Sequence, residues 1–368
     1  MVPIVRATLL TPFLAIGIAL AGTPDPAASA EATQHVRLEA NELLLADLIG
    51  KVHVTGHAGP AFEIDVTPDG RDAASDPIRI ETKEGDRAKL LIRFPVAREN
   101  HFVYPEMGRG SSTTISVRDT GEPSDEWLGW VLPGVGGHKV VIHGRGKGLE
   151  VWADVTVKVP EGKDLEVRLG VGTISAQAVK GNLVLDTHSG PVEAHTIAGS
   201  LDIDTGSGSV TAEGVQGDVK IDTGSGSVEL LGSSGQVISI DTGSGSVRAE
   251  DISCKKLTVD TGSGDVVARS IGTDDARIDT GSGSVEFALV KMGTGRFLVD
   301  TGSGGIDLRL PADASARIAA ETGGGSVRVN LPNARIDRES EDEVEVRVGA
   351  GEAEVRLDAG SGRIRISS

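Results

Sequence analysis

The sequence predicts an all-β protein: a single-stranded right-handed parallel β-helix (β-solenoid) with irregular N-terminal coils and a charged C-terminal cap. A Gly-rich unit of the form D-T-G-S-G-S-V recurs about nine times, and apolar and polar residues alternate on both sides of it. Gly accounts for 50 of 368 residues and aromatic residues for only 3%. This composition suits tight turns around narrow aliphatic layers. The right hand follows from the usual hand of parallel crossovers.

The first 30 residues predict a secretory signal peptide. Arg6 precedes an apolar run over residues 7–21, and small residues lead to Ala28-Ser29-Ala30. A basic start, a short apolar stretch and an A-x-A sequence direct export and cleavage. The apolar run is too short and too interrupted for a membrane span. We therefore expect cleavage near Ala30 and a secreted or periplasmic mature chain without a transmembrane segment.

Residues 31–165 form the predicted N-terminal β region, in which short alternating stretches indicate irregular first coils. A loop insertion at about 96–150, rich in Gly, Pro and polar residues, breaks the pattern. This insertion carries Tyr104, Trp127 and Trp130. Loop aromatics can stack on sugars, and they can equally form a small core beneath a long loop. Both interpretations are open.

Residues 166–342 form the predicted β-solenoid repeats, with successive units 18 to 21 residues apart from Asp186 to Glu321. Apolar residues stand three and one positions before each Asp, and six and eight after it. Such alternation indicates two strands around a T-G-S-G corner. A unit this small buries its apolar face only by stacking on its neighbours. Perfect copies begin at Asp204, Asp222, Asp241, Asp260, Asp279 and Asp300, and altered copies at Asp186, Glu321 and Asp358.

Residues 343–368 are predicted to be C-terminal capping strands. From Glu343 to Ile366, aliphatic residues alternate with Glu and Arg. Charges on the outer face of terminal strands protect an open sheet edge from pairing with other chains.

Charge and cysteine content narrow the classes of partner. A net charge of −18 disfavours nucleic acid and anionic lipid surfaces, both of which select Lys- and Arg-rich proteins. Cys254 is the single cysteine, so no intramolecular disulfide forms. The sequence specifies no oligomeric state.

The repeat contains D-T-G-S, the string that surrounds the catalytic Asp of pepsin-like proteases. Those enzymes need two convergent carboxylates that share a proton, whereas these Asp residues fall in one stacked column. G-x-S-x-G and H-E-x-x-H strings are absent from the sequence. We predict no catalytic residue and no metal site.

The stacked Asp residues form a predicted polar ladder, with Thr and Ser beside them on one flat face. Carboxylates about 4.8 Å apart in water repel by about 0.9 kcal/mol per neighbouring pair. An Asx-turn within each corner would offset this repulsion through backbone N–H groups. Bound Ca²⁺ is the alternative, although the repeat does not match the calcium-binding nonapeptide. We therefore expect no cofactor.

The tandem D-T-G-S-G-S-V units, together with Ala46-Asp47-Leu48-Ile49-Gly50-Lys51-Val52-His53-Val54-Thr55-Gly56, resemble the bacterial putative-adhesin families. These are domains of unknown function with a β-helical body. The resemblance covers most of the mature chain except the insertion. It implies the fold and a place in the cell envelope, and it transfers no catalytic residue.

Together these observations favour a non-enzymatic exported adhesin that presents a β-solenoid surface to a cell-surface glycan or an envelope protein. The candidate ligand-binding residues are Tyr104, Trp127 and Trp130, with the Asp ladder as a second surface. Two alternatives stay open: a polysaccharide lyase or hydrolase on a β-helix, and a periplasmic structural or stress-response component.

Overall fold

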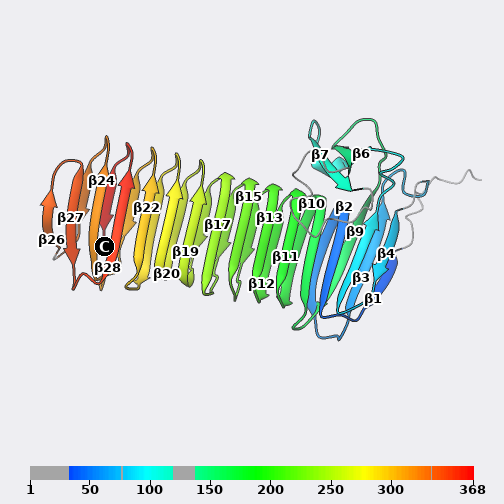
Figure 1. Cartoon of the computed structure of the whole chain (residues 1–368), viewed down its shortest axis with the longest axis horizontal. Coiled ribbons are helices and arrows are strands. Elements are labelled where there is room, and N and C mark those ends of the chain that lie inside the picture. The colour runs from blue at the N-terminus through cyan, green and yellow to red at the C-terminus, as the bar shows by residue number, and fades with distance from the viewer. Residues whose placement is uncertain (1–32, 76–77, 119–136, 333) are drawn as a thin grey trace, which may run out of the picture.

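The computed structural model describes residues 33–75, 78–118, 137–332 and 334–368. Regular structure in these residues is β, apart from one 3₁₀ turn, η1 (Pro105–Met107). The strands stack into one elongated body, and a small separate sheet lies beside its N-terminal end (Figure 1). No described helix is long and apolar enough to cross a bilayer. The all-β solenoid-like class is confirmed, while the hand of the coils stays a prediction.

Most repeat coils contribute one strand before the corner and one after it, whereas the continuous strand β20 (Val266–Thr280) supplies the second strand of one coil and the first strand of the next. In the coil of Asp204, the two strands are β13 (Leu201–Ser207) and β14 (Val210–Glu213). Parallel pairing sets Asp186 beside Asp204 and Asp204 beside Asp222, so identical repeat positions are neighbours. The other strands of the successive coils are β11 (Leu183–Ser189), β12 (Val192–Ala198), β15 (Val219–Ser225), β16 (Val228–Leu231), β17 (Val237–Ser244), β18 (Val247–Glu250), β19 (Ser253–Thr261), β20 (Val266–Thr280), β21 (Val285–Met292), β22 (Arg296–Thr301) and β23 (Ile306–Arg309).

The alternation of the sequence sends every second side chain into the space between the two strand layers. In β13, Leu201, Ile203 and Thr205 are buried, whereas Asp202 and Asp204 are half-exposed. The apolar positions predicted from the repeat form continuous buried columns in one hydrophobic cluster. Because each column continues from coil to coil, the core is as long as the stack itself.

The Thr of each unit lies inside the body, which corrects the prediction that it belongs to an outer polar face. Thr205, Thr223 and Thr242 are fully buried. Each hydroxyl donates a hydrogen bond to a Gly carbonyl in the corner of the preceding coil, as in Thr261 Oγ1 to Gly245 O at 3.0 Å. Thr187 is the exception, because its buried hydroxyl has no hydrogen-bond partner among the described residues.

Replacing Thr261 with Val should lower the free energy of unfolding by about 1–2 kcal/mol, because the Gly245 carbonyl would lose its buried donor. The same replacement at Thr187 removes a hydroxyl that makes no bond, so it should be neutral or stabilising. Urea denaturation of the two variants measures the difference. Equal losses at both positions would contradict this role for the hydroxyl.

At the N-terminal end, long strands pass through both layers without a break. β10 (Asp164–Lys180) pairs along most of its length with β2 (Glu42–His57). The coil beyond β2, towards the N-terminal end of the stack, consists of two separate strands. The first part of β2 pairs with β5 (Arg87–Arg93), and its second part pairs with β9 (Trp152–Pro160). The residues between β5 and β9 therefore occupy the place of a corner. They include η1 and the sheet of β6 (His101–Val103), β7 (Ser112–Arg118) and β8 (Gly137–His143).

Antiparallel strands close this end of the stack. β4 (Arg79–Lys83) pairs with β5 in one layer. In the other layer β3 (Phe62–Asp69) pairs with β9, and β1 (Gln34–Leu38) pairs with β3. The outermost strands β1 and β4 carry charged residues, which disfavour pairing with another chain.

The C-terminal end does not follow chain order, which corrects the predicted cap. β28 (Ala353–Ala359) pairs with β22 on one side and with β24 (Ala316–Thr322) on the other. β29 (Ile364–Ser367) likewise lies between β23 and β25 (Val327–Asn330). The last coil is thus inside the stack, as Figure 1 shows for β28.

The capping strands are instead β27 (Glu343–Val348) and β26 (Arg335–Glu339). β27 pairs antiparallel with β24, and β26 pairs antiparallel with β27. All five residues of β26 are exposed, and four of them are charged. Charge alternation alone could not separate β27 from β28, because both strands alternate Val or Leu with Glu and Arg.

Candidate functional site

The polar residues of the repeat divide between two opposite faces of the body. The Asp of each unit lies on the outer surface of the strands that precede the corner, which we call the Asp face. The second Ser of each unit lies on the outer surface of the strands that follow it, which we call the Ser face. Since Thr lies inside and the second Ser lies on the other layer, the prediction that Asp, Thr and Ser share one flat face is wrong, whereas the Asp residues do stack in one column.

On the Asp face, parallel register produces a continuous column of carboxylates. Its C-terminal part follows spatial order, so that Asp358 stands between Asp300 and Glu321. At the N-terminal end the column meets a cation, because Arg168 stands beside Asp186. In spatial order the column is Arg168, Asp186, Asp204, Asp222, Asp241, Asp260, Asp279, Asp300, Asp358 and Glu321.

Burial and mutual repulsion raise the pKa of several ladder carboxyls. Burial first, and then the charge of Asp204, raises the pKa of Asp186 to about 7. Burial and the charge of Asp222 raise the pKa of Asp204 to about 6. Burial and the charges of adjacent ladder carboxylates raise the pKa values of Asp241, Asp260 and Asp300. Asp186 therefore binds a proton near neutral pH, which relieves repulsion at its end of the ladder.

The expected Asx-turns do not form in these corners. Instead, the Thr hydroxyl accepts the local backbone N–H, as from Gly283 to Thr280 Oγ1 at 3.1 Å. The ladder is relieved in part by neighbouring cations: Arg277 lies 2.8 Å from Asp279. Protonation and scattered cations thus replace the turn hydrogen bonds predicted for the Asp side chains.

Among the described residues, no group of three or more His, Cys, Asp or Glu side chains is arranged to hold a metal ion. In a ladder with one carboxylate per coil, a cation would meet few oxygens, whereas Ca²⁺ takes six to eight. We therefore expect excess EDTA to shift the melting temperature by less than about 1 °C. A reproducible fall that added Ca²⁺ reverses would contradict this expectation.

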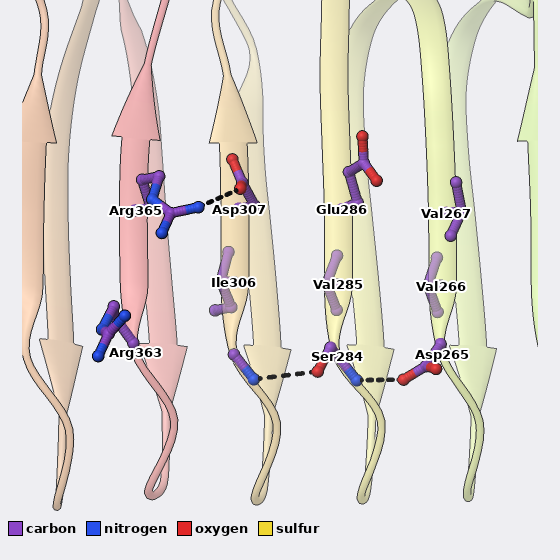
Figure 2. Close-up of a pocket in the computed structure, with 11 residues that line it drawn as sticks. Asp265, Val266, Val267, Ser284, Val285, Glu286, Ile306, Asp307, Arg363 and Arg365 are labelled. Atoms are coloured by element: carbon purple, nitrogen blue, oxygen red, sulfur yellow. Dashed lines mark hydrogen bonds and ion pairs between the residues drawn. The ribbon is translucent and has the colours of Figure 1, made fainter.

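The Ser face carries a groove that runs across the coils, and Figure 2 shows the part of it between Asp265 and Arg365. It consists of two adjoining depressions that share Asp265 and Val267. One wall, which we call the Ser wall, is formed by the residue directly before each of the strands that follow the corners, and the other wall is charged. The Ser wall holds Ser209, Ser227, Ser246 and Ser284, with Asp265, Gly305 and Arg363 at the equivalent position of the remaining coils, and the charged wall includes Glu229, Arg248, Glu286, Asp307 and Arg365.

Hydrogen bonds between coils hold the groove in shape. Ser284 N donates to Asp265 Oδ1 at 2.8 Å, and Gly305 N donates to Ser284 Oγ at 3.4 Å (Figure 2). On the other wall, Arg365 pairs with Asp307 at 3.1 Å. The side chain of Arg363 makes no hydrogen bond or ion pair in the part of the chain that the structure describes. Its guanidinium stands free at one end of the groove.

Ion pairs also link the charged wall farther along the stack. Arg248 lies 3.4 Å from Glu229 and 2.9 Å from Glu250. Arg269 in turn lies 3.7 Å from Glu250 and 2.7 Å from Glu286. This chain of alternating charges crosses four coils and leaves the wall polar with little local net charge. Such a wall suits a hydroxyl-rich ligand better than a strongly charged one.

The aromatic residues predicted as a ligand platform are only partly described. Tyr104 is buried, with its ring against Trp152 at a centroid distance of 5.6 Å. Its hydroxyl lies 3.5 Å from Glu106, and burial raises its pKa. Tyr104 therefore packs the insertion onto the coils and is not an exposed stacking surface. Trp127 and Trp130 lie outside the described residues.

Sequence reasoning missed Asp47, which is buried within β2 with no hydrogen-bond partner for either carboxylate oxygen in the described part of the chain. Burial raises its pKa well above the ordinary value; the nearby backbone N–H groups of Leu48 and Ile49 oppose this rise, and the charge of Asp154 adds to it. The signal was visible as a single acid inside Leu43-Leu44-Leu45-Ala46-Asp47-Leu48-Ile49. It also missed the groove, since the Ser wall becomes apparent only when the faces of both strands are assigned.

Comparison with known proteins supports the predicted resemblance. A family model described as Toastrack DUF4097 matches residues 72–367. No curated protein matches the chain. A putative cell adhesion protein from Clostridium sporogenes ATCC 15579 has 14% identity over 91% of this chain and 99% of its own, with a TM-score of 0.19. A putative adhesin from Bacteroides fragilis NCTC 9343 has 11% identity over 92% of this chain and 97% of its own, with a TM-score of 0.34.

Proposed function

The chain belongs to the Toastrack DUF4097 family, and from this premise we propose that it is an exported, non-enzymatic, adhesin-like protein that binds an extended cell-surface glycan. The observation that carries the proposal is the groove on the Ser face, where one wall position recurs in every coil and is Ser in four of the seven. A linear polymer of repeating hydroxyls meets such a surface many times. Weak contacts summed over several coils then give useful affinity without a deep pocket.

The chemistry of the groove fits a polyol. Ser hydroxyls both donate and accept hydrogen bonds, and the carboxylates and guanidiniums of the charged wall add strong acceptors and donors. Val267 provides a half-buried apolar spot at the junction of the two depressions. Adjacent coils are about 4.8 Å apart, so the seven positions of the Ser wall extend over about 29 Å. A single small ligand would use only part of this length.

A glycan and envelope-polymer binding array on residues 31–368 tests the proposal. A matched pair of variants separates the faces: Ser246→Arg fills the groove, and Ser239→Arg adds the same side chain to the Asp face. A third variant, Trp127→Ala/Trp130→Ala, tests the insertion. We expect saturable binding that falls at least tenfold in Ser246→Arg and is unchanged in Ser239→Arg and in the Trp variant.

The other outcomes distinguish the remaining surfaces. Loss of binding only in the Trp variant would move the site to the insertion, and loss only in Ser239→Arg would move it to the Asp face. Absence of binding by the unmodified protein would overturn the proposal and direct attention to an envelope protein as the partner, or to a structural component without a ligand.

One observation favours a polysaccharide lyase or hydrolase as a second candidate. Asp186 and Asp204 are neighbours in the ladder, and the pKa of Asp186 is about 7 while that of Asp204 is about 6. A carboxyl that keeps its proton near neutral pH beside a second carboxylate has the properties of an acid–base pair. Release of reducing or unsaturated sugar that Asp186→Asn abolishes would establish this activity. Its absence on acidic and neutral polysaccharides would support the binding function.

A further inference from the structure

The last coil, β28 and β29, fills a slot that the chain leaves open before reaching it. After β23 the chain builds β24 and β25 one position too far along the stack, and it then forms β26 and β27 beyond them. Only afterwards does residue 353 begin the coil that separates β22 from β24. The strands on both sides of the slot therefore precede, in the sequence, the coil that fills it.

Both sides of the slot accept this coil in full register. Val355 lies between Phe297 and Ile318, and Leu357 lies between Val299 and Ala320. These apolar residues of the coil are buried: Ala353, Val355, Leu357, Ala359, Ile364 and Ile366.

Backbone and side-chain groups join the coil to both neighbours. Ile306 N donates to Arg363 O at 3.0 Å on one side, and Ile364 N donates to Ser326 O at 3.0 Å on the other. Thr322 Oγ1 donates to Gly362 O at 2.8 Å, as the repeat Thr does elsewhere. An occupant of the slot thus needs the repeat sequence itself, and this chain carries that sequence in the segment from Ala353 to Ser367.

A short Gly-rich hinge connects the occupant to its own slot. Residues 349–352 cross from β27, on one side of β24, to β28 on its other side. Gly349 and Gly351 have φ values of +58° and +73°, which favour Gly. Ser315 Oγ accepts the N–H groups of Ala350 and Glu352 at 3.1 and 3.3 Å. Extension of these four residues, over about 13 Å, would release the coil without altering either strand.

We propose that the slot between β22–β23 and β24–β25 is a strand-acceptor site, and that its partner in trans is the C-terminal coil of a second copy of this chain. In reciprocal exchange each slot is refilled by an identical coil, so every contact within the slot is retained. Only the conformation of the hinge changes, which makes exchange of this element a low-cost route to a dimer. A dimer would present two grooves, and paired sites strengthen binding to a polymer.

Engineered disulfides in the full chain test the exchange. Arg317 and Glu354 are register partners across the slot, and both are exposed. In a Cys254→Ser background, which removes the free thiol, one population carries Arg317→Cys and another carries Glu354→Cys. The populations are refolded together and oxidised. A double variant with both cysteines is the geometric control, and it should close fully, within one chain when the coil occupies its own slot and between two chains when the coils are exchanged.

A matched pair in the repeat body measures random cross-linking. Asp202 and Lys220 are also register partners, but their strands follow chain order. We expect disulfide-linked heterodimers of the Arg317→Cys and Glu354→Cys chains at least fivefold above those of Asp202→Cys mixed with Lys220→Cys, with a yield that rises with protein concentration. Heterodimers no more abundant than in the Asp202–Lys220 mixture, while the double variant closes fully, would overturn the proposal.

Discussion

Replacing Gly245 with Ala should destabilise the protein by about 3 kcal/mol or more, because the corners of adjacent coils leave no space for a Cβ atom. A Cβ on Gly245 would lie 2.1 Å from the Gly226 carbonyl oxygen and 2.5 Å from its carbon. These are backbone atoms, so relief requires a shift of the whole coil. The same Gly carbonyl column accepts the Thr hydroxyls, so a shift would also weaken those hydrogen bonds.

Gly324→Ala is the matched control, because it lies in another corner of the same type. A Cβ on Gly324 would approach nothing closer than 3.8 Å. This variant should be neutral, or stabilised by up to about 1 kcal/mol through a less flexible unfolded chain. Urea denaturation of both variants, fitted with one common dependence of the free energy of unfolding on urea concentration, gives the two changes in stability. A loss of less than about 1 kcal/mol for Gly245→Ala would mean that the corners are loosely packed.

The sequence predicts the coils well because a single rule governs them. Leu201, Ile203 and Thr205 are alternate residues of one strand, so the period that buries the first two also buries the third. The inward Thr was therefore predictable from the alternation, and it was missed because a polar residue was assumed to face solvent. A buried hydroxyl that meets a carbonyl at a fixed place in the preceding coil makes the inward position favourable.

The order of the last coils could not be obtained from spacing alone. The units of Glu321 and Asp358 have the same strand pattern, and either one completes the stack on Asp300. The one available signal was the 37-residue separation between them (358 − 321), about twice the usual spacing. Two coils with the same pattern of inward residues fit the same place in the stack. Only contacts between residues far apart in the chain decide which coil takes that place, and the period of the sequence does not describe such contacts.

The groove shows a similar limit. Each Ser of its wall is an ordinary corner residue when the sequence is read along the chain. The Ser residues form a wall only because the same position of successive coils lies on the same outer face. The candidate aromatic residues, by contrast, were selected because aromatic side chains on loops can stack on sugars, and Tyr104 proved to be a packing residue.

The Asp face predicts an unusual dependence of stability on pH. The folded-state pKa of Asp186 is about 7, whereas an unfolded Asp titrates near 3.9. Between these values the unfolded chain has released the proton and the folded chain still holds it. The contribution of Asp186 to the free energy of unfolding is therefore fully present below about pH 4, and it is lost as the pH rises towards 7. Asp204 acts in the same direction over a narrower range that ends near its pKa of about 6.

Asp186→Asn removes the titration while keeping the shape of the side chain. Relative to the unmodified protein, this variant should gain about 2 kcal/mol at pH 8, after allowance for partial solvent exposure, and almost nothing at about pH 4. Denaturation of both proteins at each pH gives the difference. A gain that is the same at both pH values would show that Asp186 titrates normally.

Asp218→Asn provides a control of opposite sign. The Asp218 carboxylate accepts N–H groups from Gln236 at 2.8 Å and Val237 at 3.0 Å, and these hydrogen bonds lower its pKa. Its stabilisation is present above the unfolded pKa and is lost as pH falls through the folded value. Asp218→Asn should therefore destabilise the protein at pH 8 and have a smaller effect below about pH 4. Opposite slopes for two Asp residues two coils apart would show that the surroundings of each carboxyl, and not the net charge of −18, set the response to pH.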